Sequence, residues 1–101
     1  MKNILLICDM GMSTSLVVKR MLQAADSEGI EATIEAKGSQ DFKNVVANFD
    51  CILIAPQISY KLADFTAIAN EHGKPIALIN MMDYGLTAGD KILAQALAMM
   101  N

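Results

Sequence analysis

The chain has 101 residues, a formal net charge of −3 and 53% hydrophobic residues. Its length suits one domain that buries a single core. The eight Lys and Arg residues are scattered and aromatic residues make up only 5%, so the basic and stacking surfaces of nucleic-acid-binding proteins are missing. No apolar run approaches the roughly 18 residues of a membrane helix, and the first apolar stretch is too short for a signal peptide, so we expect a cytoplasmic protein.

The first apolar run predicts a strand over Asn3–Cys8 that ends on a cysteine. After a short loop, an amphipathic pattern predicts a helix that runs to about Glu28, where Gly29 ends it. The positions with core-facing spacing on this helix are Leu16, Val17, Met21, Leu22 and Ala25. The polar positions expected to face mostly outward are Lys19, Arg20, Gln23 and Asp26.

The second predicted strand, Glu31–Ala36, alternates polar and apolar residues. Alternation indicates that one face of a strand lies in water, so we place this strand at or near an edge of the sheet. A short helix is predicted over Asp41–Ala47, with Ser39 as its candidate cap.

The third predicted strand, Cys51–Ala55, is apolar throughout, which indicates burial on both faces and a place in the centre of the sheet. Pro56 ends it. A helix is then predicted from about Ser59 to His72, and Gly73 and Pro75 follow in the usual order of helix stop signals.

The fourth strand is predicted over Pro75–Ile79 and a last helix from about Thr87 to Met99. Strands that alternate with helices predict an α/β domain, here a four-stranded parallel sheet in the order 2-1-3-4 with helices on both faces. Cys8 then lies at the carboxyl end of a central strand, and the loops Pro56–Ile58 and Asn80–Thr87 open on the same edge. Open α/β sheets bind their ligands at that edge.

The loop after Cys8 is predicted to bind a phosphate and to make the cysteine reactive. Backbone N–H groups of the loop and of the first helical turn converge on one spot, and the helix dipole favours an anion there. The same field stabilises a thiolate, the nucleophilic form of cysteine. Gly11 lets the backbone approach closely, and the hydroxyls of Ser13, Thr14 and Ser15 can donate to phosphate or cap the helix. Cys8 is therefore predicted to form a phosphocysteine.

The remaining candidate ligands are interpreted as structural residues. The two cysteines fit neither a CxxC redox motif nor a zinc pattern, and Cys51 lies inside an apolar run, where it is predicted to pack. His72 is the only histidine and is predicted to be a solvated residue at a helix end. The methionines interpreted as core or helix-end packing are Met81, Met82, Met99 and Met100. We expect no metal ion and no other cofactor.

The layout is similar to the phosphatase loop Cys-x5-Arg, in which the Arg clamps the charge of the transition state. Here the matching position is Thr14, and the only Arg, Arg20, lies more than a turn into the helix. A phosphatase also needs an acid to protonate its leaving alcohol, and nothing around Asp83 or Asp90 singles either out. A small phosphatase or arsenate reductase therefore stays an alternative, as does a non-enzymatic module with a regulatory thiol or anion site.

Three segments of the chain carry a family resemblance. Residues 8–16, Cys-x-x-Gly-Met-Ser-Thr-Ser-Leu, resemble the active-site loop of the enzyme IIB components of the lactose/cellobiose (chitobiose) class of sugar phosphotransferase systems. The stretch Ala55–Tyr60, Ala-Pro-Gln-Ile-x-Tyr, is similar to that family's segment after the third strand, and Tyr84-Gly85 matches a feature before its last helix. Length and element order agree along essentially the whole chain, as expected of a single IIB domain over residues 1–101 with a phosphatase-like loop after its first strand.

The resemblance implies a phosphoryl relay. A phosphohistidine on an enzyme IIA partner would pass its phosphoryl group to Cys8, and Cys8 would pass it to a sugar, expected to be a disaccharide, held by the membrane-embedded enzyme IIC. Imidazole leaves easily, so transfer requires less help than hydrolysis, and this fits the missing Arg. The residues implied to bind the phosphate are Met10, Gly11, Met12, Ser13, Thr14 and Ser15. The residues implied in docking or in supporting the site are Asp9, Gln57, Tyr60 and Tyr84.

Asp9 directly follows the predicted nucleophile and would repel a phosphate if its carboxylate pointed inward. We therefore expect this side chain to face solvent or a partner. The protein itself would not enter the membrane and would reach its inner face only through enzyme IIC.

Overall fold

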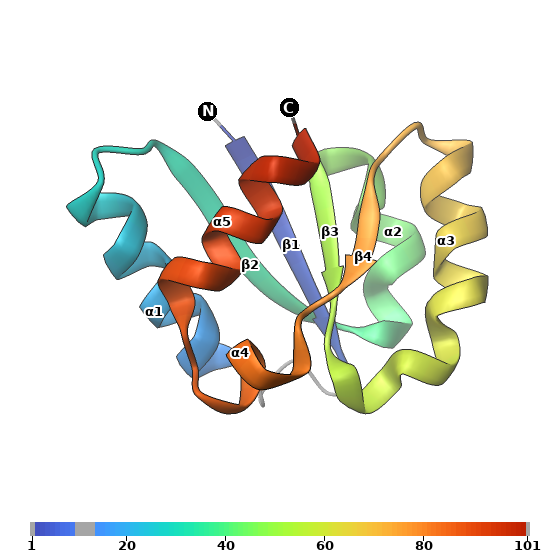
Figure 1. The fold of residues 1–101 in the computed structure, drawn as a ribbon. Coiled ribbons are helices and arrows are strands. Elements are labelled where there is room, and N and C mark those ends of the chain that lie inside the picture. Colours follow the sequence, from blue (N-terminus) through green and yellow to red (C-terminus); the bar gives the residue numbers. More distant parts are fainter. Residues whose placement is uncertain (1, 10–13, 101) are drawn as a thin grey trace.

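The computed structural model describes residues 2–9 and 14–100 and shows one four-stranded parallel sheet (Figure 1). Its strands are β1 (Lys2–Cys8), β2 (Ala32–Gly38), β3 (Cys51–Ile54) and β4 (Ile76–Leu78). They lie side by side in the order β2-β1-β3-β4, and all three neighbouring pairs are parallel. The predicted fold class and strand order are therefore confirmed.

Helices cover both faces of the sheet (Figure 1). The α-helices are α1 (Ser15–Ser27), α2 (Phe42–Val45), α3 (Leu62–Glu71), α4 (Met81–Gly85) and α5 (Gly89–Met100). Short 3-10 segments cover Ser39–Asp41, Val46–Asn48 and Pro56–Lys61. Within the described residues, no helix is long and apolar enough to cross a membrane.

The burial of the strands follows their sequence patterns. Every residue of β3 is buried, as the unbroken apolar run predicts for a central strand. The edge strand β2 instead exposes Glu35, which pairs weakly with Lys37 at 3.8 Å. The wet face of this strand confirms its predicted place at the edge of the sheet.

Two hydrophobic layers form the core, one on each face of the sheet. One joins alternate residues of β1 and β3 to the buried faces of α1 and α5. The other joins the remaining strand residues to α2 and α3, and there the rings of Phe42 and Phe65 pack 4.7 Å apart. Alternation of side chains along a strand divides each central strand between the two layers.

The contact between α1 and α5 is so close that only glycine fits at the first residue of α5. A Cβ atom on the buried Gly89 would lie 2.3 Å from the backbone carbonyl carbon of Arg20 and 2.5 Å from the backbone nitrogen of Met21. A real Cβ atom does not approach backbone that closely, so Gly89 sets the distance between these helices at the carboxyl edge of the sheet.

Several details differ from the sequence predictions. The stripe of α1 that reaches the core consists of Val17, Met21 and Ala25, whereas Leu16 and Leu22 lie beside it and are 47% and 41% exposed. The core-facing position predicted for these two residues from their helical spacing is therefore wrong. Ser39 is not a helix cap, because it lies inside a 3-10 segment where its hydroxyl accepts from Lys61 Nζ at 3.3 Å, although Lys61 is far away in sequence.

The loop predicted over Asn80–Thr87 contains α4, which the sequence interpretation missed. Asn80 caps this short helix, since its side-chain oxygen accepts from the backbone N–H of Asp83 at 3.1 Å. The predicted packing of Met81 and Met82 is wrong, because both side chains are about three-quarters exposed on α4. Met99 and Met100, by contrast, pack against the core as predicted.

Candidate functional site

The carboxyl edge of the sheet gathers the segments that the sequence analysis singled out. Cys8 is the last residue of β1, and α1 begins a few residues later. The segment after β3 and the helix α4 lie at the same edge (Figure 1). The predicted site residues Met10, Gly11, Met12 and Ser13 lie outside the described residues.

Cys8 and Thr14 meet at the centre of this edge. Both are fully buried, and the Thr14 hydroxyl donates to Cys8 Sγ at 3.6 Å. Thr14 occupies the N-cap position of α1 but makes no side-chain cap hydrogen bond, so the cap predicted among these hydroxyl residues is not formed by Thr14. Its hydroxyl is directed at the sulfur instead.

The start of α1 is electrostatically suited to an anion. α3, α4 and α5 each carry an aspartate in the first turn, namely Asp64, Asp83 and Asp90. The first turn of α1 holds no acidic side chain. Because a helix N-terminus favours negative charge, the start of α1 can stabilise a bound anion.

Asp9 and Ser15 flank the buried pair on the surface. Asp9 is exposed, which agrees with the expectation that its carboxylate faces outward. Ser15 begins α1 and is exposed as well. Among the described residues from 8 to 15, the buried positions are therefore those of Cys8 and Thr14.

A side-chain hydrogen bond joins the two other segments of this edge. Gln57 Nε2 donates to the Tyr84 hydroxyl at 3.3 Å, linking the segment after β3 to α4. Both residues were sequence candidates, but only the structure brings them together. Tyr60 is 73% exposed, and Lys61 Nζ lies 5.9 Å from the centre of its ring.

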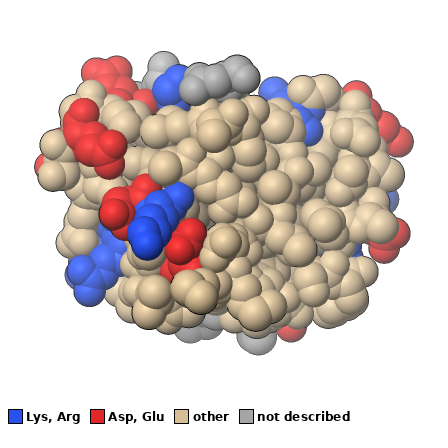
Figure 2. Space-filling view, viewed as in Figure 1, with Lys and Arg blue, Asp and Glu red and all other residues tan. Residues whose placement is uncertain are grey.

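The residues around α4 form an apolar corner, which we define as Met81, Met82 and Leu86. Their side chains are between 67% and 75% exposed. Figure 2 shows that charged side chains gather over α1 and the start of α5, whereas the surface over α4 and the rest of α5 is mostly uncharged. The apolar corner therefore lies at the same edge of the sheet as Cys8 and is open to solvent. The sequence signal that could have revealed α4 is the three-residue spacing of Asn80 and Asp83, which matches the pattern of a helix start.

The opposite edge of the sheet has a different character. Cys51 begins β3, is fully buried, and lies with its Sγ 3.9 Å from Met99 Sδ. Burial, and secondarily the negative charge of Asp50, raise the pKa of the Cys51 thiol to about 12.

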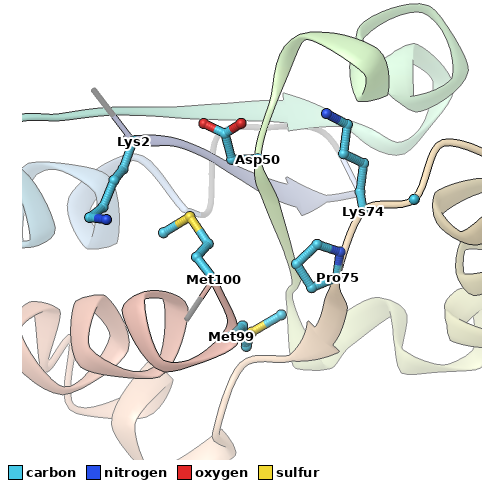
Figure 3. Close-up of a pocket in the computed structure, with 7 residues that line it drawn as sticks. Lys2, Asp50, Lys74, Pro75, Met99 and Met100 are labelled. Atoms are coloured by element: carbon cyan, nitrogen blue, oxygen red, sulfur yellow. The ribbon is translucent and has the colours of Figure 1, made fainter.

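An open hollow of about 460 Å3 lies nearby, with Lys2, Asp50, Lys74, Pro75, Met99 and Met100 on its walls (Figure 3). Within the described residues, no three His, Cys, Asp or Glu side chains gather in a way that could hold a metal ion.

Comparison with known proteins assigns the family. The family described as "PTS system, Lactose/Cellobiose specific IIB subunit" matches residues 3–95. This chain belongs to that family. It is 41% identical over 100 residues to the oligo-beta-mannoside-specific EIIB component of Bacillus subtilis, covering 99% of this chain and 97% of the relative. It is 39% identical over 105 residues to the galactose-specific EIIB component of Lactococcus lactis subsp. cremoris, with the same coverage.

The IIB fold also matches a solved structure. The cellobiose-specific phosphotransferase IIB component from Borrelia burgdorferi superposes with a TM-score of 0.84 at 42% identity, covering 99% of this chain and 92% of that one. This IIB protein is therefore a sugar phosphotransferase component with the role of a phosphoryl carrier, and a phosphatase or arsenate reductase is not favoured.

Proposed function

We propose that Cys8 carries the phosphoryl group, accepting it from a phosphohistidine of an enzyme IIA and passing it to a sugar held by a membrane enzyme IIC. The observation that supports this most directly is the position of Cys8, buried at the carboxyl end of a central strand beside a helix start without acidic side chains. A helix N-terminus stabilises both a thiolate and a phosphoryl group.

The proposed phosphate cradle is the turn between β1 and α1. It consists of Met10, Gly11, Met12, Ser13, Thr14 and Ser15. Backbone N–H groups of this turn would hold the phosphoryl oxygens, with help from the hydroxyl side chains. No Arg lies in the turn, and this favours transfer over hydrolysis.

The proposed partners approach the same edge of the sheet. The apolar corner of Met81, Met82 and Leu86 offers a surface that enzyme IIA or enzyme IIC can cover during transfer. Asp9, Gln57, Tyr60 and Tyr84 are assigned to docking or to support of the site; the Gln57–Tyr84 bond would hold α4 in place. We place the protein in the cytoplasm as a single IIB domain, at the membrane only when it meets enzyme IIC.

The sugar is assigned to the partner rather than to this chain. Relatives of nearly equal identity carry the names oligo-beta-mannoside-specific and galactose-specific. This variation among similar IIB chains agrees with sugar recognition in enzyme IIC, and a disaccharide is the proposed substrate class.

The deciding experiment is phosphorylation in vitro. The protein is incubated with phosphoenolpyruvate, enzyme I, HPr and a candidate enzyme IIA, and its mass is then measured. We expect a phosphate-sized gain that Cys8→Ser abolishes and Cys51→Ser retains. A gain that survives in Cys8→Ser, or turnover of a generic aryl phosphate at the rate of a phosphatase, would contradict the proposal.

A further inference from the structure

The Thr14 hydroxyl is in contact with the sulfur that reacts. Among the described residues, Thr14 is the only polar or charged side chain that is buried, and its Oγ1 lies 3.6 Å from Cys8 Sγ. We propose that Thr14 is a catalytic residue of the transfer, because its hydroxyl hydrogen bond stabilises the Cys8 thiolate that attacks phosphorus and that leaves when the phosphoryl group moves on. This inference rests on the proposed function, in which Cys8 carries the phosphoryl group.

The side chain of Thr14 does not form the capping hydrogen bond that its N-cap position allows. A threonine at an N-cap ordinarily accepts a hydrogen bond from a backbone N–H of the first turn, and Thr14 makes no such bond. Elsewhere in the chain a helical threonine bonds the backbone, since Thr66 donates to the carbonyl of Leu62 at 2.7 Å. The Thr14 hydroxyl makes neither of these hydrogen bonds to the backbone and donates to a side-chain sulfur instead.

Burial makes this hydrogen bond consequential. Because no part of Thr14 is exposed, its hydroxyl cannot exchange the sulfur for bulk water without movement of the site. A hydrogen bond to a charged acceptor is stronger than one to a neutral acceptor. The contact therefore stabilises the thiolate more than the thiol or the phosphorylated sulfur.

The two transfers show where the bond acts. In the first, the thiolate attacks phosphorus, an S–P bond forms, and the N–P bond breaks with its electron pair left on the imidazole. The imidazole then takes up one proton from solvent, equal to the proton that the thiol released. In the second, a sugar hydroxyl oxygen attacks phosphorus, the S–P bond breaks with its pair returned to sulfur, and the hydroxyl proton passes to solvent.

The hydrogen bond from Thr14 affects the arrival of the phosphoryl group at Cys8 and its departure unequally. A donor that lowers the basicity of a thiolate reduces its nucleophilicity somewhat but makes it a better leaving group. Charge develops on the departing sulfur, so the Thr14 bond strengthens toward that transition state. Thr14 should therefore speed the departure of the phosphoryl group from Cys8 more than its arrival.

The first test is the pH dependence of Cys8 alkylation, measured in a Cys51→Ala background. Thr14→Val removes the hydroxyl and keeps the branched shape, and we expect it to raise the midpoint by about one pH unit or more. Thr14→Ser should keep the original midpoint. Thr66→Val, which removes a hydroxyl that bonds only the backbone of α3, is the matched control and should change nothing at Cys8.

The second test uses phosphoryl exchange with enzyme IIA at a pH above both midpoints, where Cys8 is a thiolate in each variant. Thr14→Val should slow return of the phosphoryl group from Cys8 to enzyme IIA by about three- to tenfold and leave loading nearly unchanged. Should Thr14→Val not fold, Thr14→Ser and Thr14→Ala form a second pair that differs only in the hydroxyl.

The outcomes separate the two proposals. An unchanged midpoint together with equal effects on loading and return would overturn the role of Thr14, even if wild-type Cys8 becomes phosphorylated. A raised midpoint in a protein whose Cys8 never acquires phosphate from a phosphorylated enzyme IIA would instead overturn the carrier role and keep the hydrogen bond to the thiolate.

Discussion

The two cysteines of this protein are equally buried but lie at opposite ends of the sheet. Cys8 ends β1 and Cys51 begins β3, and neither side chain is exposed. Alternation along the paired strands directs both side chains to the face covered by α1 and α5, because Ile4 is the register partner of Cys51 and shares the orientation of Cys8. The difference between them is therefore one of position along the strands.

The helix termini beside the two cysteines have opposite electrostatic signs. Cys8 lies at the start of α1 and receives a hydrogen bond from Thr14. Cys51 lies against Met99 near the last turn of α5, and its neighbour in sequence is the negatively charged Asp50. A helix start favours an anion and a helix end disfavours one. In this parallel sheet, whose helices run antiparallel to the strands, a cysteine at the carboxyl end of a strand lies near a helix start and one at the amino end lies near a helix end. The position of a cysteine along its strand thus decides whether its thiolate is stabilised.

The sharpest test of this comparison is the rate of alkylation of each cysteine in the native protein. With a pKa of about 12, only about one Cys51 in a thousand is ionised at pH 9. Both thiols are buried, so the fraction of thiolate decides between them. We therefore expect Cys8, whose thiolate Thr14 and the start of α1 stabilise, to react about a thousandfold faster. Peptide mapping after a pulse of iodoacetamide measures both rates at once. Faster labelling at Cys51 would break the comparison.

The raised pKa of Cys51 also predicts a loss of stability at high pH. The thiol stays protonated in the folded protein up to about pH 12, whereas the unfolded chain releases this proton near the ordinary cysteine pKa of 9.0. Stability from this group is therefore complete below pH 9 and falls by about 1.4 kcal/mol per pH unit between 9 and 12. Urea unfolding across this range measures the slope, and Cys51→Ala should flatten it relative to wild type. Parallel slopes in the two proteins would show that Cys51 is not the cause.

At the Cys8 end, the close contact of α1 with α5 can be tested by adding one methyl group. Gly89→Ala places a Cβ atom against the backbone of Arg20 and should destabilise the fold by about 3 kcal/mol, as overpacking does. Gly85→Ala is the matched control, because a Cβ atom there meets nothing within 4 Å. Chemical denaturation of both variants measures the difference. Equal stabilities would mean that the helices separate at little cost.

The smallest expected effect concerns α4, which has no counterpart at the Cys51 end. Asn80→Ala removes the cap of this helix and should cost about 1 kcal/mol of unfolding free energy. It should also slow phosphoryl transfer from enzyme IIA, because the apolar corner depends on α4. Asn80→Ser keeps a capping oxygen and serves as the control. Normal transfer by Asn80→Ala would remove α4 from the docking surface.

Much of the fold could be predicted from local signals in the sequence. The apolar run at Cys51 indicated a central strand, and Gly29 and Gly73 both adopt the positive φ expected of helix stops. Leu16 and Leu22 were misassigned because the apolar stripe predicted on α1 is wider than the stripe that reaches the core. The helix α4 was missed because five residues are too few to show a period.

The contacts within the site could not be predicted in the same way. The loop motif pointed to Cys8, but which hydroxyl reaches the sulfur depends on the path of the chain between β1 and α1. Thr14 is six residues from Cys8 in sequence, and no spacing rule places its Oγ1 on that sulfur. The bond between Gln57 and Tyr84 joins segments 27 residues apart and depends equally on tertiary packing.

The burial of Cys51 has a consequence for measuring motion in this protein. A thiol without exposed surface reacts only when the core around it opens, so its labelling reports transient unfolding of the sheet. Cys8 is equally buried but lies at the end of β1 beside Thr14, so its labelling reports opening of the carboxyl edge of the sheet. Each molecule thus contains two thiol probes on the same face of the sheet. A single labelling experiment can separate transient opening of the core at Cys51 from opening of the site at Cys8.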